Sequence, residues 1–179
     1  MDGTFVPTKS FHDAETIATL DTEVFFELDL MVNDPLPIIE AFANSSQTVR
    51  AIIHAEIGGD IRALLEEIKN LGLESGLALL PKSDITEYEH LYNSCDVILI
   101  RGNEPGYAGR ELLPSSIEKV TILRAKYPEL SIAVDIGVNE QTIPLLVASG
   151  ATYLSVNTAI FGAKDPIEAY SHLQALAET

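Results

Sequence analysis

The sequence predicts an α/β fold in which short parallel strands alternate with helices. Apolar runs and helical patterns take turns along nearly all of its 179 residues. Most of the apolar runs are continuous, as expected for parallel strands that are covered on both faces. Repeated strand–helix units imply a parallel sheet with right-handed crossovers. The length, together with a hydrophobic fraction of 46%, fits a single domain, residues 1–179, with a packed core.

Six apolar runs are predicted as strands, because each is short and is bounded by turn or helix signals. In chain order they are Val24–Met31, Ala51–Ala55, Gly76–Leu80, Val97–Arg101, Ser131–Asp135 and Tyr153–Val156.

Four helices have recognisable start and stop signals. Asp60 is the predicted N-cap of a helix whose apolar residues share one face and which Gly72 closes. Pro follows a capping Asp at the start of two others, a combination typical of first helical turns. The first of these two runs from Asn33-Asp34-Pro35 to about Ala43, and the second from Asp165-Pro166 to Ala177. The fourth predicted helix begins at Asn139 and ends at Gly150.

Composition restricts the partners and the compartment. The 11 basic and 27 acidic residues give a net charge of −16, which repels nucleic acid phosphates and anionic membrane surfaces, so we expect neither partner. The single Cys95 cannot form an internal disulfide, which fits a reducing cytoplasm. We see no signal peptide and no apolar stretch of the ~20 residues that a membrane span needs. The sequence therefore predicts a cytoplasmic protein.

Two architectures satisfy the strand–helix repeat: an open doubly wound sheet and a (βα)8 barrel. No Gly-x-Gly-x-x-Gly loop follows the first strand, so the dinucleotide-binding version of the open sheet has no support. Composition and periodicity do not decide between the two architectures.

Six segments favour the barrel. In chain order they are Met1–Pro7, Leu28–Pro35, Ile53–Glu56, Glu104–Arg110, Val134–Asn139 and Val156–Gly162. Each alone is ordinary loop sequence, but their order and spacing resemble those of the ribulose-phosphate 3-epimerase family. These enzymes of carbohydrate metabolism interconvert ribulose and xylulose 5-phosphates. The resemblance implies a (βα)8 TIM barrel of the ribulose-phosphate-binding type, with a small phosphorylated sugar as substrate.

The resemblance also implies that the predicted strands are the third to eighth of the barrel. Because a closed barrel needs eight strands, we expect this domain to be partial and the sequence to be N-terminally truncated, with a start codon assigned at a motif Met. A natural short variant that closes its open edge as a homo-oligomer is the alternative.

Epimerisation beside a carbonyl needs an acid/base group on each face of the carbon and a group that stabilises the enediolate oxygen. In the family, two Asp transfer the protons, and a divalent metal ion held by those Asp and two His stabilises the oxygen. The resemblance implies that Asp135 is one of these Asp, both catalytic and a metal ligand. Asp29 stands where the family has a ligand His, and a carboxylate also suits a divalent cation. The alternative for Asp135 is a carboxylate at a turn or helix start.

Arg101 departs from the family, which carries an apolar Met at the end of this strand. Because a buried Arg needs an anion, we expect it to pair with Asp29 or Asp135 across the barrel mouth, in place of the metal. The alternatives are binding of a substrate carboxylate or phosphate, or extension of the side chain to solvent. Four residues are expected to line the pocket: Met1, Met31, His54 and Arg101.

The phosphate-binding loops are also altered. The resemblance implies that backbone N–H groups after the last two strands hold the phosphate, with Gly106 and Gly109 in an earlier loop. The paired Gly of the family is here Ile136-Gly137, and its Gly-Ser is Asn157-Thr158. We therefore expect weaker phosphate binding than in the family.

Three functions remain open. The first is epimerisation of a ketopentose 5-phosphate at C3 by two-base proton transfer. The second is a catalytically impaired or inactive family member that binds a phosphorylated ligand or a protein partner, which the substitutions at expected site positions favour. The third is another phosphosugar reaction on the same barrel, such as decarboxylation, in which Asp29 and Arg101 would be new catalytic groups.

Overall fold

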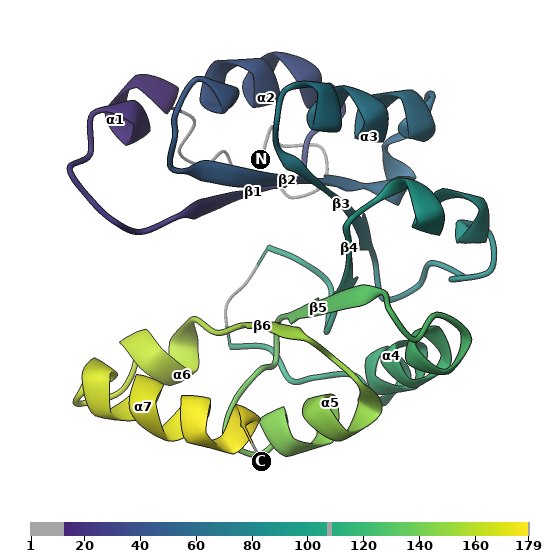
Figure 1. Ribbon diagram of the computed structural model, residues 1–179. Helices are drawn as coiled ribbons and strands as arrows, with labels where there is room; N and C mark the ends of the chain where they lie inside the picture. Colours follow the sequence, from purple (N-terminus) through teal and green to yellow (C-terminus); the bar gives the residue numbers. More distant parts are fainter. Residues whose placement is uncertain (1–12, 107–108, 179) are drawn as a thin grey trace. The chain divides into compact units, whose positions relative to one another are not determined.

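The computed structural model describes residues 13–106 and 109–178 (Figure 1). The chain divides into two compact units. Of the described residues, the first unit comprises 13–78 and 84–97, and the second comprises 79–83, 98–106 and 109–178. Within each unit, neighbouring strands follow the order of the chain, β1-β2-β3 and β4-β5-β6.

The first unit is built on three strands in parallel pairs, in which Leu30 is opposite Ile53 and Ile53 is opposite Leu77. Figure 1 shows α2 and α3 on one face of these strands. The strands are β1 (Phe26–Leu30), β2 (Thr48–His54) and β3 (Glu74–Leu79). The helices are α1 (Ala14–Ala18), α2 (Leu36–Ala43) and α3 (Ile61–Asn70), with 3-10 turns η1 (Ala55–Ile57) and η2 (Glu89–Ser94).

The core of the first unit forms where β2 meets the apolar faces of its helices. Ile52 and Ile53 are fully buried, and so are Leu65 and Ile68, which lie on one face of α3. Gly76 leaves room for this packing, because a Cβ there would lie 2.5 Å from Cγ1 of Ile52. Because Gly76 has no side chain, the large apolar Ile52 of β2 fits beside β3.

The second unit repeats the arrangement, with α5 and α7 covering one face of β5 and β6 (Figure 1). Asp135 at the end of β5 is opposite Ser155 of β6, so the loops that follow these parallel strands leave at the same edge. The strands are β4 (Val97–Arg101), β5 (Ser131–Asp135) and β6 (Tyr153–Ser155). The helices are α4 (Pro114–Lys126), α5 (Ile143–Ser149), α6 (Thr158–Phe161) and α7 (Pro166–Ala177).

All six predicted strands are present, each overlapping its predicted range. Asp60 caps α3 as predicted, accepting a hydrogen bond from the N–H of Ala63. The predicted start at Asn139 is wrong, since α5 begins at Ile143. Asn139 instead forms a turn, in which its side-chain oxygen accepts from the N–H groups of Gln141 and Thr142. Within the part of the chain that the structure describes, no helix is long and apolar enough to cross a membrane.

Candidate active site

The carboxyl ends of β4 and β5 bring together Arg101 and Asp135. Arg101 Nη1 donates a hydrogen bond to Asp135 Oδ2 at 2.5 Å, an ion pair within the second unit. The Arg101 side chain is 0% exposed, whereas that of Asp135 is 31% exposed. The pair therefore joins a fully buried cation to a carboxylate that solvent reaches. The predicted alternative in which Arg101 extends to solvent is wrong, and of the two predicted partners the one seen is Asp135.

The backbone around this pair is tightly closed. The Gly102 N–H donates to the carbonyl of Asp135 at 2.7 Å, and the Ser116 hydroxyl of α4 donates to the carbonyl of Arg101 at 2.9 Å. A Cβ on Gly102 would lie 1.9 Å from the carbonyl oxygen of Ile136. These contacts fix the backbone at both strand ends, from which the guanidinium and the carboxylate extend.

The loop after β5 carries backbone strain. Ile136 has a φ of 74° and is the one non-glycine residue with positive φ among residues 13–106 and 109–178. A β-branched residue in this conformation costs about 1–3 kcal/mol. Gly137 follows with a φ of 80°, and its carbonyl accepts from the Thr142 hydroxyl at 2.7 Å. Strain persists only where the surroundings over-determine it, and it clusters at functional sites.

The expected phosphate-binding residues lie in loops of the second unit. Gly106 and Gly109 both have positive φ, at 109° and 77°. Asn157 precedes α6, and Thr158 is its first residue. Because the loops after β5 and β6 leave at the same edge, Gly137 and Thr158 belong to neighbouring loops. Residues 107 and 108 lie outside the described part of the chain.

A second cluster lies at the strand ends of the first unit. His54 is fully buried between two carboxylates, with Nε2 at 3.8 Å from Asp29 Oδ1 and Nδ1 at 3.5 Å from Glu56 Oε2. Asp29 lies on β1, opposite Ile52 of β2. Met31 follows β1 directly and is half-buried. Met1, expected beside these residues, lies outside the described residues, as does the rest of the segment Met1–Pro7.

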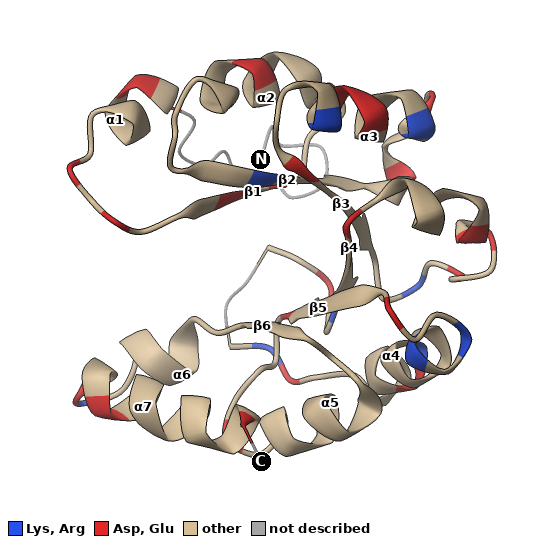
Figure 2. Cartoon of the chain, viewed as in Figure 1, with Lys and Arg blue, Asp and Glu red and all other residues tan. Residues whose placement is uncertain are grey.

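Acidic groups are most numerous in the first unit. Figure 2 shows Asp and Glu on many of its elements, whereas Lys and Arg are scattered, with more than one on α3 and on α4. Burial and the nearby charge of Asp96 raise the pKa of Cys95 to about 12, which disfavours the reactive thiolate. Burial alone would raise the pKa of Asp96, but hydrogen bonds from Ser75 and the charge of Lys69 outweigh it and lower that pKa.

The described residues do not fit a divalent metal ion. Within residues 13–106 and 109–178, no group of three or more His, Cys, Asp or Glu side chains could hold one. Asp135 instead has a guanidinium on Oδ2, and Asp29 has the ring of His54 within 3.8 Å. The metal that the family implies therefore has no ligand set in this part of the chain.

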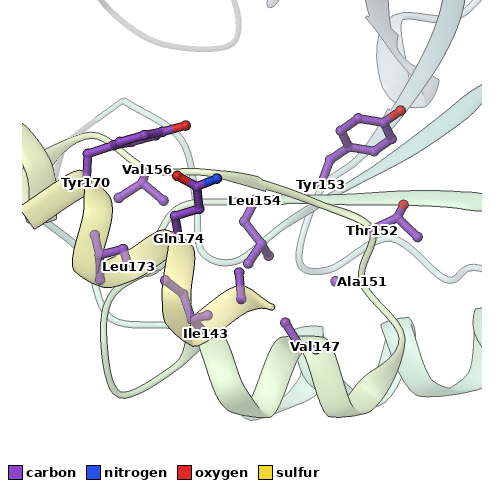
Figure 3. A pocket seen from close by; sticks show the side chains of 11 residues that line it. Ile143, Val147, Ala151, Thr152, Tyr153, Leu154, Val156, Tyr170, Leu173 and Gln174 are labelled. Carbon is purple, nitrogen blue, oxygen red and sulfur yellow. The ribbon is translucent and has the colours of Figure 1, made fainter. Parts of the chain in front are cut away.

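A hollow of about 420 Å³ lies elsewhere in the second unit (Figure 3). It opens among α5, β6 and α7, and apolar side chains such as Val147, Leu154 and Leu173 form most of its wall. None of the predicted site residues lines it. The hollow therefore lies between the helices and the strand they cover, and not at the strand ends that carry Arg101 and Asp135.

Comparison with known proteins decides the family. The model of the ribulose-phosphate 3 epimerase family matches residues 1–161. The chain belongs to the ribulose-phosphate 3-epimerase family. It is 33% identical over 184 residues to the cytoplasmic isoform of ribulose-phosphate 3-epimerase from Oryza sativa subsp. japonica, covering 99% of this chain and 80% of that one. It is 34% identical over 171 residues to ribulose-phosphate 3-epimerase from Chlamydia pneumoniae, covering 91% and 74%.

Solved structures confirm the TIM-barrel class. KGPDC from Streptococcus mutans superposes with a TM-score of 0.74 at 12% identity, covering 92% of this chain and 78% of that chain. A 3-hexulose-6-phosphate synthase superposes with a TM-score of 0.67 at 18% identity, covering 84% and 72%. At such identities the likeness concerns the fold alone. The barrel predicted from the six segments is therefore correct.

Sequence reasoning missed two contributors to these clusters. Ser116, which holds the carbonyl of Arg101, was not predicted, because the helix α4 that carries it was not predicted either. Glu56 ends one of the six segments, but the segment alone does not predict that its carboxylate lies 3.5 Å from Nδ1 of His54. The start Leu113-Pro114-Ser115-Ser116 was the available signal for α4, since Pro favours a first helical turn.

Proposed function

We propose that this chain is an isomerase that epimerises a ketopentose 5-phosphate at C3. Membership of the ribulose-phosphate 3-epimerase family supports this reaction class. The observation that carries the proposal is Asp135, a partly exposed carboxylate at the carboxyl end of β5, where TIM barrels place catalytic groups.

In the proposed reaction, Asp135 acts as a general base towards C3. It takes the proton of the C3–H bond, whose electron pair forms a double bond between C2 and C3, while the π pair of the C2 carbonyl moves onto its oxygen. An acid on the opposite face, a carboxylic acid or water, returns a proton to C3 and restores the carbonyl. No step passes through a metal ion, because the described residues do not fit one.

The loops of the second unit are proposed to hold the substrate phosphate. The backbone N–H groups of Gly137 and Thr158, in neighbouring loops, are the groups proposed to donate to the anion. Asn157, Gly106 and Gly109 complete this proposed loop set.

A second candidate is a family member that binds a phosphorylated ligand without turnover. The pairing of Asp135 with a buried guanidinium favours it, because a carboxylate neutralised by a fixed cation is a weaker base than a solvated one.

The test is conversion of ribulose 5-phosphate to xylulose 5-phosphate by purified protein, with and without added divalent ions. Asp135→Asn should lower kcat by about 10²–10⁴-fold, the usual contribution of a general base. Asp21→Asn, in the segment ahead of β1, is the matched control and should retain full activity. Binding of the sugar phosphate with no turnover under any condition would favour the second candidate.

A further inference from the structure

We propose that the buried guanidinium of Arg101, rather than a divalent metal ion, is the resident cation of Asp135, and that the chain neither needs nor binds a catalytic metal. This inference rests on the proposed function for its catalytic meaning. Its structural part, that a guanidinium already contacts the carboxylate of Asp135, depends only on the geometry of the ion pair.

The first support is the contact itself. Nη1 of Arg101 lies 2.5 Å from Oδ2 of Asp135, so the guanidinium and the carboxylate are in direct contact as an ion pair. A carboxylate oxygen in such contact with a fixed positive charge is a poor ligand for a second cation, since the two positive charges would repel each other at short range.

The second support is burial. Arg101 is among the largest fully buried side chains, and a buried guanidinium without an anion is strongly disfavoured. A metal ion that took Asp135 as a ligand would compete for the counter-ion of Arg101. Metal binding at Asp135 would therefore leave the buried cation without its anion and destabilise the fold, which opposes such binding.

The third support is rigidity. The Gly102 N–H holds the carbonyl of Asp135, and the Ser116 hydroxyl holds the carbonyl of Arg101. The backbone that carries both side chains is thus fixed at the ends of two neighbouring strands, and the Arg101 side chain is itself fully buried there. A charge held in this way needs no reorganisation when the reaction develops charge nearby.

Arg101 is a positioning residue, because its buried side chain acts through Asp135. When Asp135 accepts the C3 proton it becomes neutral, and one negative charge moves to the substrate oxygen on C2. The positive charge of Arg101 stays in place throughout. It then faces the developing enediolate through the carboxyl group, a role that the metal ion fills in the family.

The experiment begins with the unmodified chain. Protein treated with EDTA and passed over a desalting column is analysed for metal content, titrated with Mg²⁺, Mn²⁺, Co²⁺ and Zn²⁺ by calorimetry, and assayed with ribulose 5-phosphate. We expect substoichiometric metal, no saturable binding, and turnover that is unchanged by EDTA or by added ions.

Variants at Arg101 supply the second measurement. Arg101→Met should lower kcat by about 10²-fold while KM changes little, as for an interaction made mainly in the transition state. Arg101→Lys, which keeps a positive charge, should recover part of kcat. Arg62→Met, which removes an arginine that contacts Ser94 and the His90 carbonyl in the first unit, is the control and should keep wild-type turnover.

The outcomes separate the two proposals. Turnover that requires a divalent ion, or one ion bound per chain with saturation, overturns this inference and leaves the epimerase proposal standing. No turnover under any condition overturns the epimerase proposal, and the calorimetric titration of the unmodified chain still decides the inference. Loss of turnover in Arg101→Lys equal to that in Arg101→Met would show that charge is not what Arg101 contributes.

Discussion

Gly102→Ala tests the tight closure between the ends of β4 and β5. Gly102 does not need glycine for its backbone conformation, since its φ is not in the left-handed region, so its requirement is one of space. An added Cβ would lie 1.9 Å from the carbonyl oxygen of Ile136 and 2.9 Å from Cδ1 of Leu112. The nearer atom belongs to the backbone, so the two strand ends would have to move apart to admit the methyl group.

The magnitude follows from two terms. Overpacking against a rigid neighbour costs about 1–3 kcal/mol. Separation of the strand ends also weakens the 2.7 Å hydrogen bond from the Gly102 N–H to the Asp135 carbonyl, which is worth about 0.5–1.5 kcal/mol. The free energy of unfolding should therefore fall by about 2–4 kcal/mol, which for a chain of this size lowers Tm by about 4–16 °C.

Equilibrium unfolding in urea, followed by circular dichroism, measures this loss. Gly59→Ala is the matched control, because Gly59 has a φ of +78° but no atom within 4 Å of its added Cβ. It should cost only the backbone strain, about 1–2 kcal/mol. If Gly102→Ala proves no more destabilising than Gly59→Ala, the close approach of Gly102 to Ile136 is wrong, and with it the argument that the main chain fixes Arg101 against Asp135.

Two further predictions concern stability and reactivity. Lys119→Met should lower the free energy of unfolding by about 2–4 kcal/mol. The Lys119 ammonium donates to the carbonyls of Leu80, Pro81 and Ser83 at 2.6–3.1 Å. One charge-assisted hydrogen bond is worth about 1.5–3 kcal/mol, and because this site is only partly buried, water replaces part of the three bonds in the variant. Lys164→Met, on an exposed loop, is the control for urea unfolding, and equal losses would contradict the prediction. Alkylation of Cys95 at pH 8 should be about 1,000-fold slower in the folded chain than in urea, because burial raises the thiol pKa from 9.0 to about 12 and only the thiolate reacts. The folded-state rate should rise tenfold per pH unit up to about pH 12 while the chain stays folded, and a rate equal to that of the unfolded chain would refute the burial argument.

The strands were predictable because their sequence signal is strong and local. β4 and β5 are continuous apolar runs whose interior residues are almost fully buried, as parallel strands between two layers must be. Helix α4 was not predicted, because its sequence signal is weak. It buries Val120 and Leu123 but leaves Ile122 53% exposed, so apolar residues are not confined to one face and the helical period is blurred.

The candidate site was predictable in composition but not in pairing. That Arg101 needs a carboxylate follows from the chemistry of a buried guanidinium, and this was inferred from the position of Arg101 at a strand end. Which of Asp29 and Asp135 pairs with Arg101 depends on the directions of the side chains, and these cannot be deduced from the residue types and strand positions alone. The contact between His54 and Glu56 was likewise hidden, because the two belong to different elements, β2 and η1.

Ile136 bears on whether the geometry of this site serves a function. A glycine would carry no penalty at a positive φ, yet this chain holds a β-branched residue there at a φ of 74°, at a cost of about 1–3 kcal/mol. A loop that served no purpose could relax by a small rotation. Here it is prevented from relaxing by the Gly102 N–H bond to the Asp135 carbonyl on one side and by the Thr142 hydroxyl bond to the Gly137 carbonyl on the other. The same contacts position Asp135 and the N–H groups proposed to bind phosphate. The retained strain therefore supports the proposal that this site binds a phosphorylated ligand, and the ion pair with Arg101 keeps the carboxylate of Asp135 in place.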